Sequence, residues 1–286
     1  MKTAELFKEK TVLSYEVFPP KRTGPINTIY ETLENIKSLN PDFISVTYGA
    51  NGGKKTSATF EIASVIKNNY GIESVAHLPC IGLSKTDVLI KLDELREINV
   101  ENILALRGDV QGDDGIDGDF RYASDLILFI KEHGDFNIIS ACYPEGHFQA
   151  QNRVEDIRNL KIKVDAGTNQ LITQLFFDNN YFYSFLERCQ LVDIKVPVEA
   201  GIMPVINKKQ IEHMVNICGV DLPKKFTTMM ERYEDNPIAM RDAGIAYAID
   251  QIVDLITQGV SGIHLYTMNN PYIARKIYEA VHNLII

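Results

Sequence analysis

The sequence contains no tryptophan, few cysteines and no excess of basic residues. Its 286 residues include 29 Lys and Arg against 38 Asp and Glu, which leaves a formal net charge of −9. This balance disfavours nucleic acids and anionic membranes as partners, because both attract basic patches. No apolar run approaches the ~18 residues that a membrane-spanning helix needs. The charged first residues, MKTAELFKEK, lack the apolar stretch of a secretory signal, so we expect no signal peptide.

The four cysteines lie far apart, in or beside apolar stretches, at Cys80, Cys142, Cys189 and Cys218. They form no CxxC pair, and the zinc motif HExxH is absent as well. We therefore expect reduced thiols in a cytoplasmic protein, and no metal site. With 45% hydrophobic and 23% charged residues, the composition is typical of a globular protein rather than a disordered or fibrous one.

Short runs rich in apolar and β-branched residues alternate with amphipathic stretches along the whole chain. Apolar positions that recur at three and four residues indicate helices at 26–39, 86–98, 122–133 and 153–167. Eight strands in an uninterrupted series with helices predict an α/β fold, the (β/α)8 TIM barrel. The expected strands are LSYEVF (13–18), FISVTY (43–48), SVAHL (74–78), NILALR (102–107), NIISACY (137–143), LITQLFF (171–177), VEAGIMPV (198–205) and GIHLYTM (262–268).

The span 207–261, between the seventh and eighth expected strands, is long enough for extra helices, such as QIEHMVNIC and IAMRDAGIAYAIDQIVDLI. No Pro- or Ser-rich linker and no internal repeat divides the chain, so we expect one catalytic domain over residues 1–286. The alternative is a doubly wound open sheet, which usually carries a Gly-rich turn after its first strand. Neither GxGxxG nor GxxxxGK[ST] occurs, which favours the barrel.

Active sites of such barrels lie at the carboxyl ends of the strands. Each expected strand offers polar groups there, and the serine-hydrolase motif GxSxG is absent. The polar groups are Glu16, Thr47, Tyr48, Asn51, His77, Arg107, Asp109, Tyr143, Glu145, His147, Gln174, Asp178, Asn207, Tyr266 and Asn269.

Glu16 stands out because it interrupts the apolar run SYEVF. Partial burial favours the protonated form of a carboxyl, which would let this side chain act as a general acid. The alternative is an ion pair with a neighbouring Lys or Arg that closes the barrel floor. His77 and His147 could each contact a ring or a phosphate, or serve only the structure.

Arg107 and Asp109 flank Gly108, where the backbone can approach a ligand closely. The guanidinium suits a phosphate and the carboxylate suits a polar heterocycle, although the two could also simply pair with each other. The following loop, VQGDDGIDGD, is acidic but lacks the Gly and Glu positions of a calcium-binding loop, so we expect no calcium site.

Motifs that occur in order along the chain resemble those of the methylenetetrahydrofolate reductases, over about residues 11 to 270. The resemblance implies a flavin-dependent barrel, and the absence of a C-terminal extension is similar to the short bacterial form. The motifs are SYEVFPPK (14–21), SVTYGANGG (45–53), AHLPCIG (76–82), LALRGD (104–109), YASDL (122–126), SACYPEGH (140–147), LKIKVDAGTNQLITQLFFD (160–178) and GIMPV (201–205).

The resemblance implies a flavin-dependent oxidoreductase acting on CH–NH donors. In its ping-pong cycle, NADH or NADPH, with NADH preferred, reduces FAD, and hydride then passes to 5,10-methylenetetrahydrofolate. The product, 5-methyltetrahydrofolate, serves methionine synthesis. By position, Glu16 matches the general acid, Asp109 the carboxylate beside flavin and pterin, and Gln174 the amide that contacts folate. A homo-oligomer is possible for a barrel of this kind.

The FAD contacts that the resemblance implies are Thr47, Tyr48, Ala50, His77, Arg107, Gly108, Asp109, Tyr122, Ala123, Tyr143, His147, Asp156, Asn159 and Lys163. Three positions depart from the family pattern. Asn270 follows YTMN where an Arg that helps to bind folate is common, and Ile162 replaces a basic residue. Met214 stands near the place of an aromatic that stacks on nicotinamide.

Two other functions fit the fold. One is a folate-dependent one-carbon transferase without a redox flavin, against which the Arg107 and Lys163 pair argues. The other is a non-catalytic flavin- or pterin-binding protein in a larger assembly, against which Glu16 argues.

Overall fold

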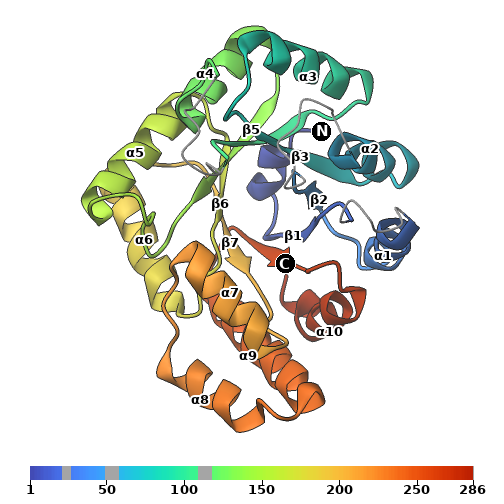
Figure 1. The fold of residues 1–286 in the computed structure, drawn as a ribbon, viewed down its shortest axis with the longest axis vertical. Helices are drawn as coiled ribbons and strands as arrows, with labels where there is room; N and C mark the ends of the chain where they lie inside the picture. Colours follow the sequence, from blue (N-terminus) through green and yellow to red (C-terminus); the bar gives the residue numbers. More distant parts are fainter. Residues whose placement is uncertain (21–26, 49–57, 109–117, 286) are drawn as a thin grey trace.

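The computed structural model describes residues 1–20, 27–48, 58–108 and 118–285. Parallel strands β1 to β8 pair in chain order, and β8 pairs with β1, so the sheet is a closed barrel (Figure 1). This confirms the predicted TIM barrel over the open sheet. The strands are β1 (Val12–Val17), β2 (Phe43–Val46), β3 (Glu73–Pro79), β4 (Asn102–Leu106), β5 (Asn137–Cys142), β6 (Gln170–Thr173), β7 (Val198–Ile202) and β8 (Gly262–Tyr266).

Helices surround the barrel, and three of them (α7, α8 and α9) lie between β7 and β8, as predicted. The predicted helices at 26–39, 86–98, 122–133 and 153–167 correspond to α1, α3, α4 and α5, with ends that differ by at most two residues. The helices are η1 (Thr3–Lys8), α1 (Asn27–Lys37), α2 (Ala58–Ser64), η2 (Val65–Asn69), α3 (Lys85–Glu97), α4 (Ala123–His133), α5 (Arg153–Asp165), α6 (Asn179–Leu191), α7 (Lys208–Cys218), α8 (Lys224–Tyr233), α9 (Pro237–Thr257), α10 (Pro271–Val281) and η3 (His282–Leu284).

The sixth strand is shorter than the apolar run 171–177 that predicts it. β6 ends at Thr173, and the apolar residues after it pack against helices instead. Phe176 stacks on Phe182 of α6 with ring centroids 5.6 Å apart, and Phe177 stacks on Phe226 of α8 at 4.6 Å. The apolar run 171–177 therefore contains both strand residues and residues that pack against helices, and periodicity alone does not distinguish the two.

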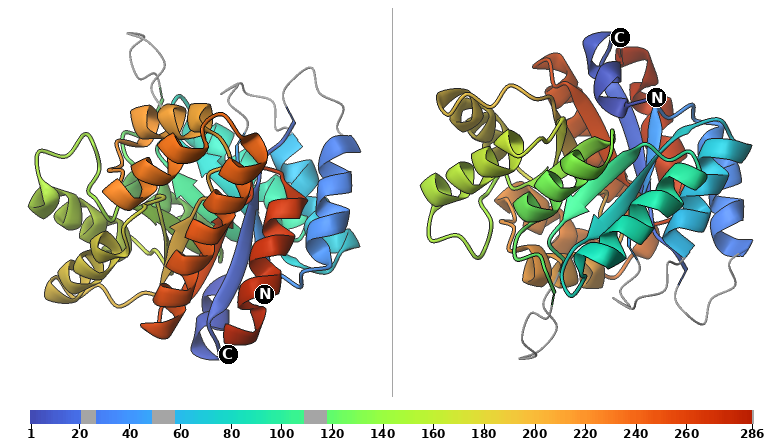
Figure 2. Two further views of the ribbon diagram at one scale, coloured as in Figure 1. Left: turned by 90° about the horizontal axis from the view of Figure 1, so that it is seen from below. Right: turned by 90° about the horizontal axis from the view of Figure 1, so that it is seen from above.

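The amino end of the barrel is closed by η1. Thr3 is fully buried there, and its hydroxyl donates to Gln170 Oε1 at 2.7 Å. Its backbone N–H donates to Asn102 Oδ1 at 2.9 Å, and Asn137 Nδ2 donates to its hydroxyl at the same distance. Both chain termini lie at this end, whereas α7 and α8 lie at the other (Figure 2). The barrel interior is therefore closed at its amino end.

Asn and Asp side chains start several of the helices that follow strands. Asp178 accepts from the Asn180 N–H at 2.9 Å to cap α6, and Asn207 accepts from the Gln210 N–H at 2.8 Å to cap α7. Asn270 caps α10 in the same way. The polar residues at these three strand ends therefore act as N-caps, a role for which Asn and Asp are preferred.

The described residues contain no helix that is both long and apolar enough to cross a membrane. All four cysteines lie in the described ranges and form no disulfide. No group of three or more metal-ligating side chains gathers within the part of the chain that the structure describes.

Helix α9 approaches the chain after β7 so closely that its contact requires glycine. A β-carbon added at Gly244 would lie 1.7 Å from the carbonyl oxygen of Val205, a backbone atom that cannot rotate away. Met203 and Val205, which follow β7, are buried in the hydrophobic cluster between this helix and α7. Helix α9 can therefore lie this close to the chain after β7 only because residue 244 is a glycine.

We expect Gly244→Ala to lower the free energy of unfolding by about 3 kcal/mol, because α9 must move outward to accommodate the methyl group. Urea unfolding followed by circular dichroism measures the change. Val253→Ala, at an exposed position of the same helix, is the matched control and should leave stability nearly unchanged. Equal stability of the two variants would show that the helix does not need this close contact.

Candidate functional site

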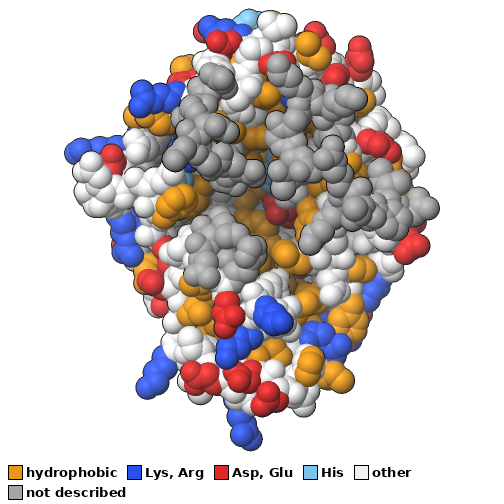
Figure 3. All heavy atoms as spheres, viewed as in Figure 1, with side chains coloured by type: hydrophobic (Ala, Val, Ile, Leu, Met, Phe, Trp, Pro, Cys, Tyr) orange, Lys and Arg blue, Asp and Glu red, His pale blue; other side chains and the backbone are white. Residues whose placement is uncertain are grey.

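Two adjoining cavities open at the carboxyl ends of the strands. The outer cavity, about 600 Å³, lies among β4, β5, α4 and α5, and the central cavity, about 430 Å³, lies over the barrel centre. Both volumes fall in the range of small-molecule sites. Figure 3 shows the hollow in this face, with acidic and hydrophobic side chains visible inside it. The residues that line both cavities are Leu106, Arg107, Ala141, Tyr143 and His147.

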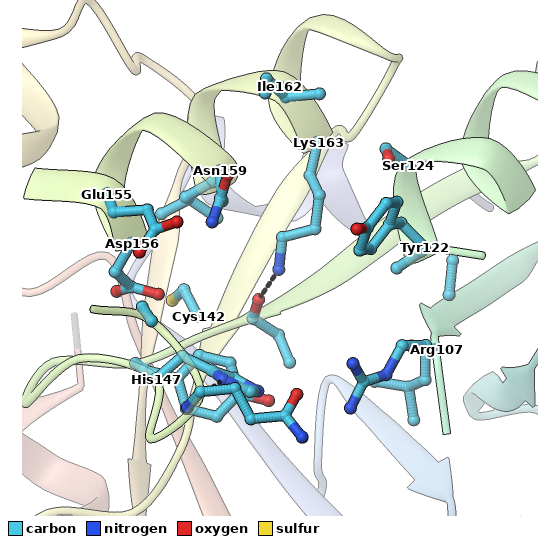
Figure 4. Close-up of a pocket in the computed structure, with 18 residues that line it drawn as sticks. Arg107, Tyr122, Ser124, Cys142, His147, Glu155, Asp156, Asn159, Ile162 and Lys163 are labelled. Atoms are coloured by element: carbon cyan, nitrogen blue, oxygen red, sulfur yellow. Dashed lines mark hydrogen bonds between the residues drawn. The ribbon is translucent and has the colours of Figure 1, made fainter. Parts of the chain in front are cut away.

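Two cationic side chains point into the outer cavity from different elements (Figure 4). Lys163 extends from α5, and its Nζ donates to the carbonyl oxygen of Ala141 at 2.5 Å. Arg107 extends from the end of β4, where its Nε donates to the Gly108 carbonyl at 3.4 Å. Burial lowers the pKa of Lys163, so an anion beside it would stabilise the charged form.

The pKa of His147 shows how the outer cavity affects a positive charge. Its pKa is lowered, first by burial and then by the positive charges of Arg107 and Lys163. Both cations therefore act on the same point of the cavity. A site that disfavours an added positive charge in this way favours a phosphate or another anion.

Aromatic rings and polar groups complete the outer cavity. The His147 ring lies edge-on to Tyr143 with centroids 4.5 Å apart and stacks on Phe148 at 4.7 Å. From α5, Asp156 and Asn159 face the same space, and burial raises the pKa of Asp156. The cavity thus offers flat apolar surfaces, hydrogen-bonding groups and two cations to one ligand.

Glu16 lies in the central cavity between two histidines. Its Oε2 is 3.5 Å from Nε2 of His77 on β3 and 3.6 Å from Nε2 of His264 on β8. Among the described residues, these histidines rather than a Lys or Arg are its ionisable partners, and the site is at the carboxyl end rather than the floor. Burial lowers the pKa of His77 to about 4, so this ring is neutral around Glu16 at neutral pH.

Gln174 follows the end of β6 and lines the central cavity. Its backbone N–H donates to the Cys142 carbonyl at 2.7 Å, and its Oε1 accepts from the Leu175 N–H at 2.9 Å. Met214 and Cys218 of α7 line the same cavity, so the helix inserted after β7 forms part of the site. The position that departs from the family's aromatic pattern therefore faces the central cavity.

The predicted residues divide into three groups. Thr47 and Tyr48, at the end of β2, lie outside both cavities, where the Thr47 carbonyl accepts from Thr59 Oγ1 and Tyr48 Oη accepts from Lys91 Nζ. Ala50 and Asp109 are outside the described residues. The others line one or both cavities: Arg107, Tyr122, Ala123, Tyr143, His147, Asp156, Asn159 and Lys163 the outer one, and Glu16, His77, Arg107, Gly108, Tyr143, His147 and Gln174 the central one.

The departures from the family pattern have structural roles. Asn270 caps α10 and Ile162 lines the outer cavity with an exposed side chain. Sequence reasoning missed His264, although it interrupts an apolar strand just as Glu16 does. Phe148 and Cys218 carried no such signal, since one comes from a loop and the other from an inserted helix.

Comparison with known proteins shows which family the chain is similar to. The family model described as methylenetetrahydrofolate reductase matches residues 2–282. The chain is 37% identical over 272 residues to 5,10-methylenetetrahydrofolate reductase of Pectobacterium carotovorum, covering 95% of this chain and 89% of the relative. It is 36% identical to the protein of that name from Escherichia coli K12, covering 95% and 90%.

A solved structure is similar in fold. It is an uncharacterized protein from Clostridium thermocellum that binds two copies of 5-methyl-5,6,7,8-tetrahydrofolic acid. The TM-score is 0.60 at 16% sequence identity, with 98% of this chain and 97% of the other covered. At this identity the likeness shows the shared fold alone.

We expect His77 to stay neutral from pH 8 down to about pH 5, because burial opposes its charged form more strongly than Glu16 favours it. Titration of ¹⁵N-histidine-labelled protein by NMR measures this directly. Free histidine, which titrates near ~6.5, is the reference in the same buffer series. A His77 ring that becomes charged near that value would mean that Glu16 lies beside a cation instead.

Proposed function

The chain belongs to the methylenetetrahydrofolate reductase family, and on that premise we propose that it reduces 5,10-methylenetetrahydrofolate to 5-methyltetrahydrofolate with FAD as cofactor. NADH is the preferred hydride donor in this proposal, with NADPH as the alternative. The observation that carries it is the pair of joined cavities, one with two cations and the other with Glu16 between two histidines.

The outer cavity suits the charged and aromatic parts of FAD. Arg107 and Lys163 would hold the pyrophosphate, since a guanidinium and an ammonium from different elements can neutralise two phosphates without a Gly-rich turn. Tyr143 and His147 lie where the two cavities join, which would bring the flavin ring toward the central cavity. Bound there, the flavin would supply the capacity to accept hydride from the nicotinamide and give it to the folate.

The central cavity suits the proton chemistry of the folate. The substrate's methylene bridges two nitrogens, so its conversion to a methyl group needs a hydride at carbon and a proton at the nitrogen that is released. Glu16 is the acid in this proposal, and a neutral His77 leaves it free of a fixed positive partner. Gln174 would contact the pterin, and Asp109, which lies outside the described residues, remains the predicted carboxylate beside it.

The wider setting stays a proposal as well. We infer that the product supplies methyl groups for methionine synthesis. Cysteines without disulfides fit a reducing compartment such as the cytoplasm. We also propose that the barrel can self-associate, which a measurement of its oligomeric state in solution would test.

We expect Glu16→Gln to slow oxidation of the reduced flavin by methylenetetrahydrofolate by about 100-fold or more, because an amide cannot donate the required proton. Reduction of the flavin by NADH should change less than about twofold, since that step needs no acid at this position. Anaerobic stopped-flow absorbance measures both half-reactions separately. Normal folate-dependent oxidation in the variant would remove Glu16 from the acid role.

We expect Lys163→Met to weaken FAD binding by about tenfold or more, because the pyrophosphate loses one of two cations. Lys161→Met is the matched control, since Lys161 is on the same helix but pairs with Asp165. Quenching of flavin fluorescence on titration of apoprotein gives both affinities. Equal FAD affinities would place the pyrophosphate elsewhere, and a wild-type protein that binds no flavin would favour the flavin-free one-carbon transferase.

A further inference from the structure

Three buried side chains on neighbouring strands form a hydrogen-bonded chain that ends beside Glu16. Ser14 Oγ on β1 lies 2.5 Å from Glu199 Oε1 on β7 and 2.6 Å from His264 Nδ1 on β8. None of these three residues is exposed to solvent. The other ring nitrogen of His264, Nε2, lies 3.4 Å from Ser45 Oγ and 3.6 Å from Glu16 Oε2.

We propose that Glu199, Ser14 and His264 relay a proton through the barrel interior to Glu16, and that they are positioning residues for the folate step. This inference rests on the proposed function, in which Glu16 donates the proton. It adds a buried proton store to the site and gives His264 a defined tautomer at each stage.

The strand register brings the chain together. Ser14 pairs with His264 across the closing β1–β8 ladder, and Glu199 pairs with Gly262 across β7–β8. Gly262 makes room for the carboxyl, because a β-carbon there would lie 3.1 Å from Cγ of Glu199. The carboxyl can therefore reach the Ser14 hydroxyl between the two strands.

The single hydroxyl of Ser14 couples the two ends of the chain. When Glu199 is protonated, it donates to Ser14, Ser14 donates to Nδ1 of His264, and Nε2–H faces Glu16. When Glu199 is ionised, Ser14 donates to it, Nδ1–H donates to Ser14, and Nε2 faces Glu16 as an acceptor. The protonation state of Glu199 therefore sets which tautomer of His264 Glu16 meets.

The transfer conserves protons along the chain. As Glu16 gives its proton to the substrate nitrogen, Glu199 passes a proton to Ser14 Oγ, Ser14 passes its own to Nδ1, and the Nε2 proton moves to Glu16. Glu199 loses one proton and Glu16 regains one, while Ser14 and His264 keep their number. The step requires the gap between Nε2 and Oε2 to close from 3.6 Å to about 3 Å, by movement of the Glu16 side chain.

The electrostatics of Glu199 suit a proton store. Burial raises its pKa to about 7, against the opposing effects of His264 and Ser14, and Asp42 adds to the rise. Its Oε2 has no hydrogen-bond partner among the described residues. A glutamine would satisfy Ser14 without the cost of burying a titratable group, so a purely structural role gives no reason for a carboxyl here.

The charged and titratable groups around the chain come from several strands. Glu199 is faced by His264 and by Asp42, which pairs with Lys10 at the start of β1. At the other end, Glu16 is faced by His77 and His264, and its charge also acts on Tyr266. We therefore expect the pH dependence of the relay to follow the protonation of Glu199, whose pKa these groups modify.

The test uses Glu199→Gln and Ser14→Ala, with Ser140→Ala as the matched control. Ser140 is also a fully buried strand serine, but its hydroxyl bonds Thr168, outside the relay. In ¹⁵N-histidine-labelled wild-type protein, NMR should show His264 changing from the Nε2–H to the Nδ1–H tautomer as pH rises through about 7. Glu199→Gln should hold one tautomer throughout, whereas Ser140→Ala should behave as wild type.

The kinetic arm measures oxidation of the reduced flavin by the folate. Wild-type rates should fall as pH rises through the region where Glu199 loses its proton, and Glu199→Gln should be about tenfold slower below it and lack that fall. Ser14→Ala should show the same loss, and flavin reduction by NADH should be unchanged in all variants. If Glu199→Gln does not fold, Ser14→Ala decides the outcome.

A His264 tautomer that ignores pH and Glu199, or variants with wild-type folate kinetics, would overturn the relay. The NMR arm needs neither flavin nor folate, so it separates the two ideas. A wild-type chain that switches tautomer but turns over no folate would defeat the proposed function and the relay's use in it. A chain that reduces folate without the switch would defeat the relay alone.

Discussion

The ladder between β1 and β8 is the contact on which the site depends, because it closes the sheet and gathers the strand ends around one centre. Glu16 pairs with Tyr266 in that ladder, and Ser14 pairs with His264 two residues earlier. Closure therefore places the side chains of the first and last strands within reach of each other although about 250 residues separate them. An open sheet of the same strands would leave Glu16 at an edge without these partners.

Closure also solves a problem of buried polarity. Polar side chains inside a barrel must find hydrogen-bond partners, because an unpaired buried group costs about 1–3 kcal/mol. At the amino end, Thr3 binds Asn102 and Gln170 and seals the floor. Higher up, an apolar layer that includes Val12 and Phe43 separates this floor from the rest of the interior. The interior is thus layered, and buried polar groups above the floor, such as Ser14, Glu199 and His264, find partners in one another.

The fold was predictable because its signals are local and repeated: short apolar runs and helical periodicity that alternate along the chain. Glu16 was predictable for a similar reason, since a carboxyl inside an apolar strand is costly without a purpose. His264 carried the same signal but gained meaning only from the register that sets it beside Ser14. Thr47 and Tyr48 lie outside the two cavities and contact Thr59 and Lys91, so their FAD contacts stay a prediction.

The two cavities differ in the charges that surround their titratable side chains. In the outer cavity, burial and then the positive charges of Arg107 and Lys163 lower the pKa of His147, which disfavours a third cation there. In the central cavity, Glu16 lies beside the imidazole of His77, which is neutral at neutral pH. If Arg107 or Lys163 stood beside Glu16, the carboxyl would be fixed as an anion and could not donate a proton. Among the described residues, Glu16 pairs with histidines and with neither cation, although Arg107 lines the central cavity too, so an anion-binding group and a candidate acid can share the same barrel mouth.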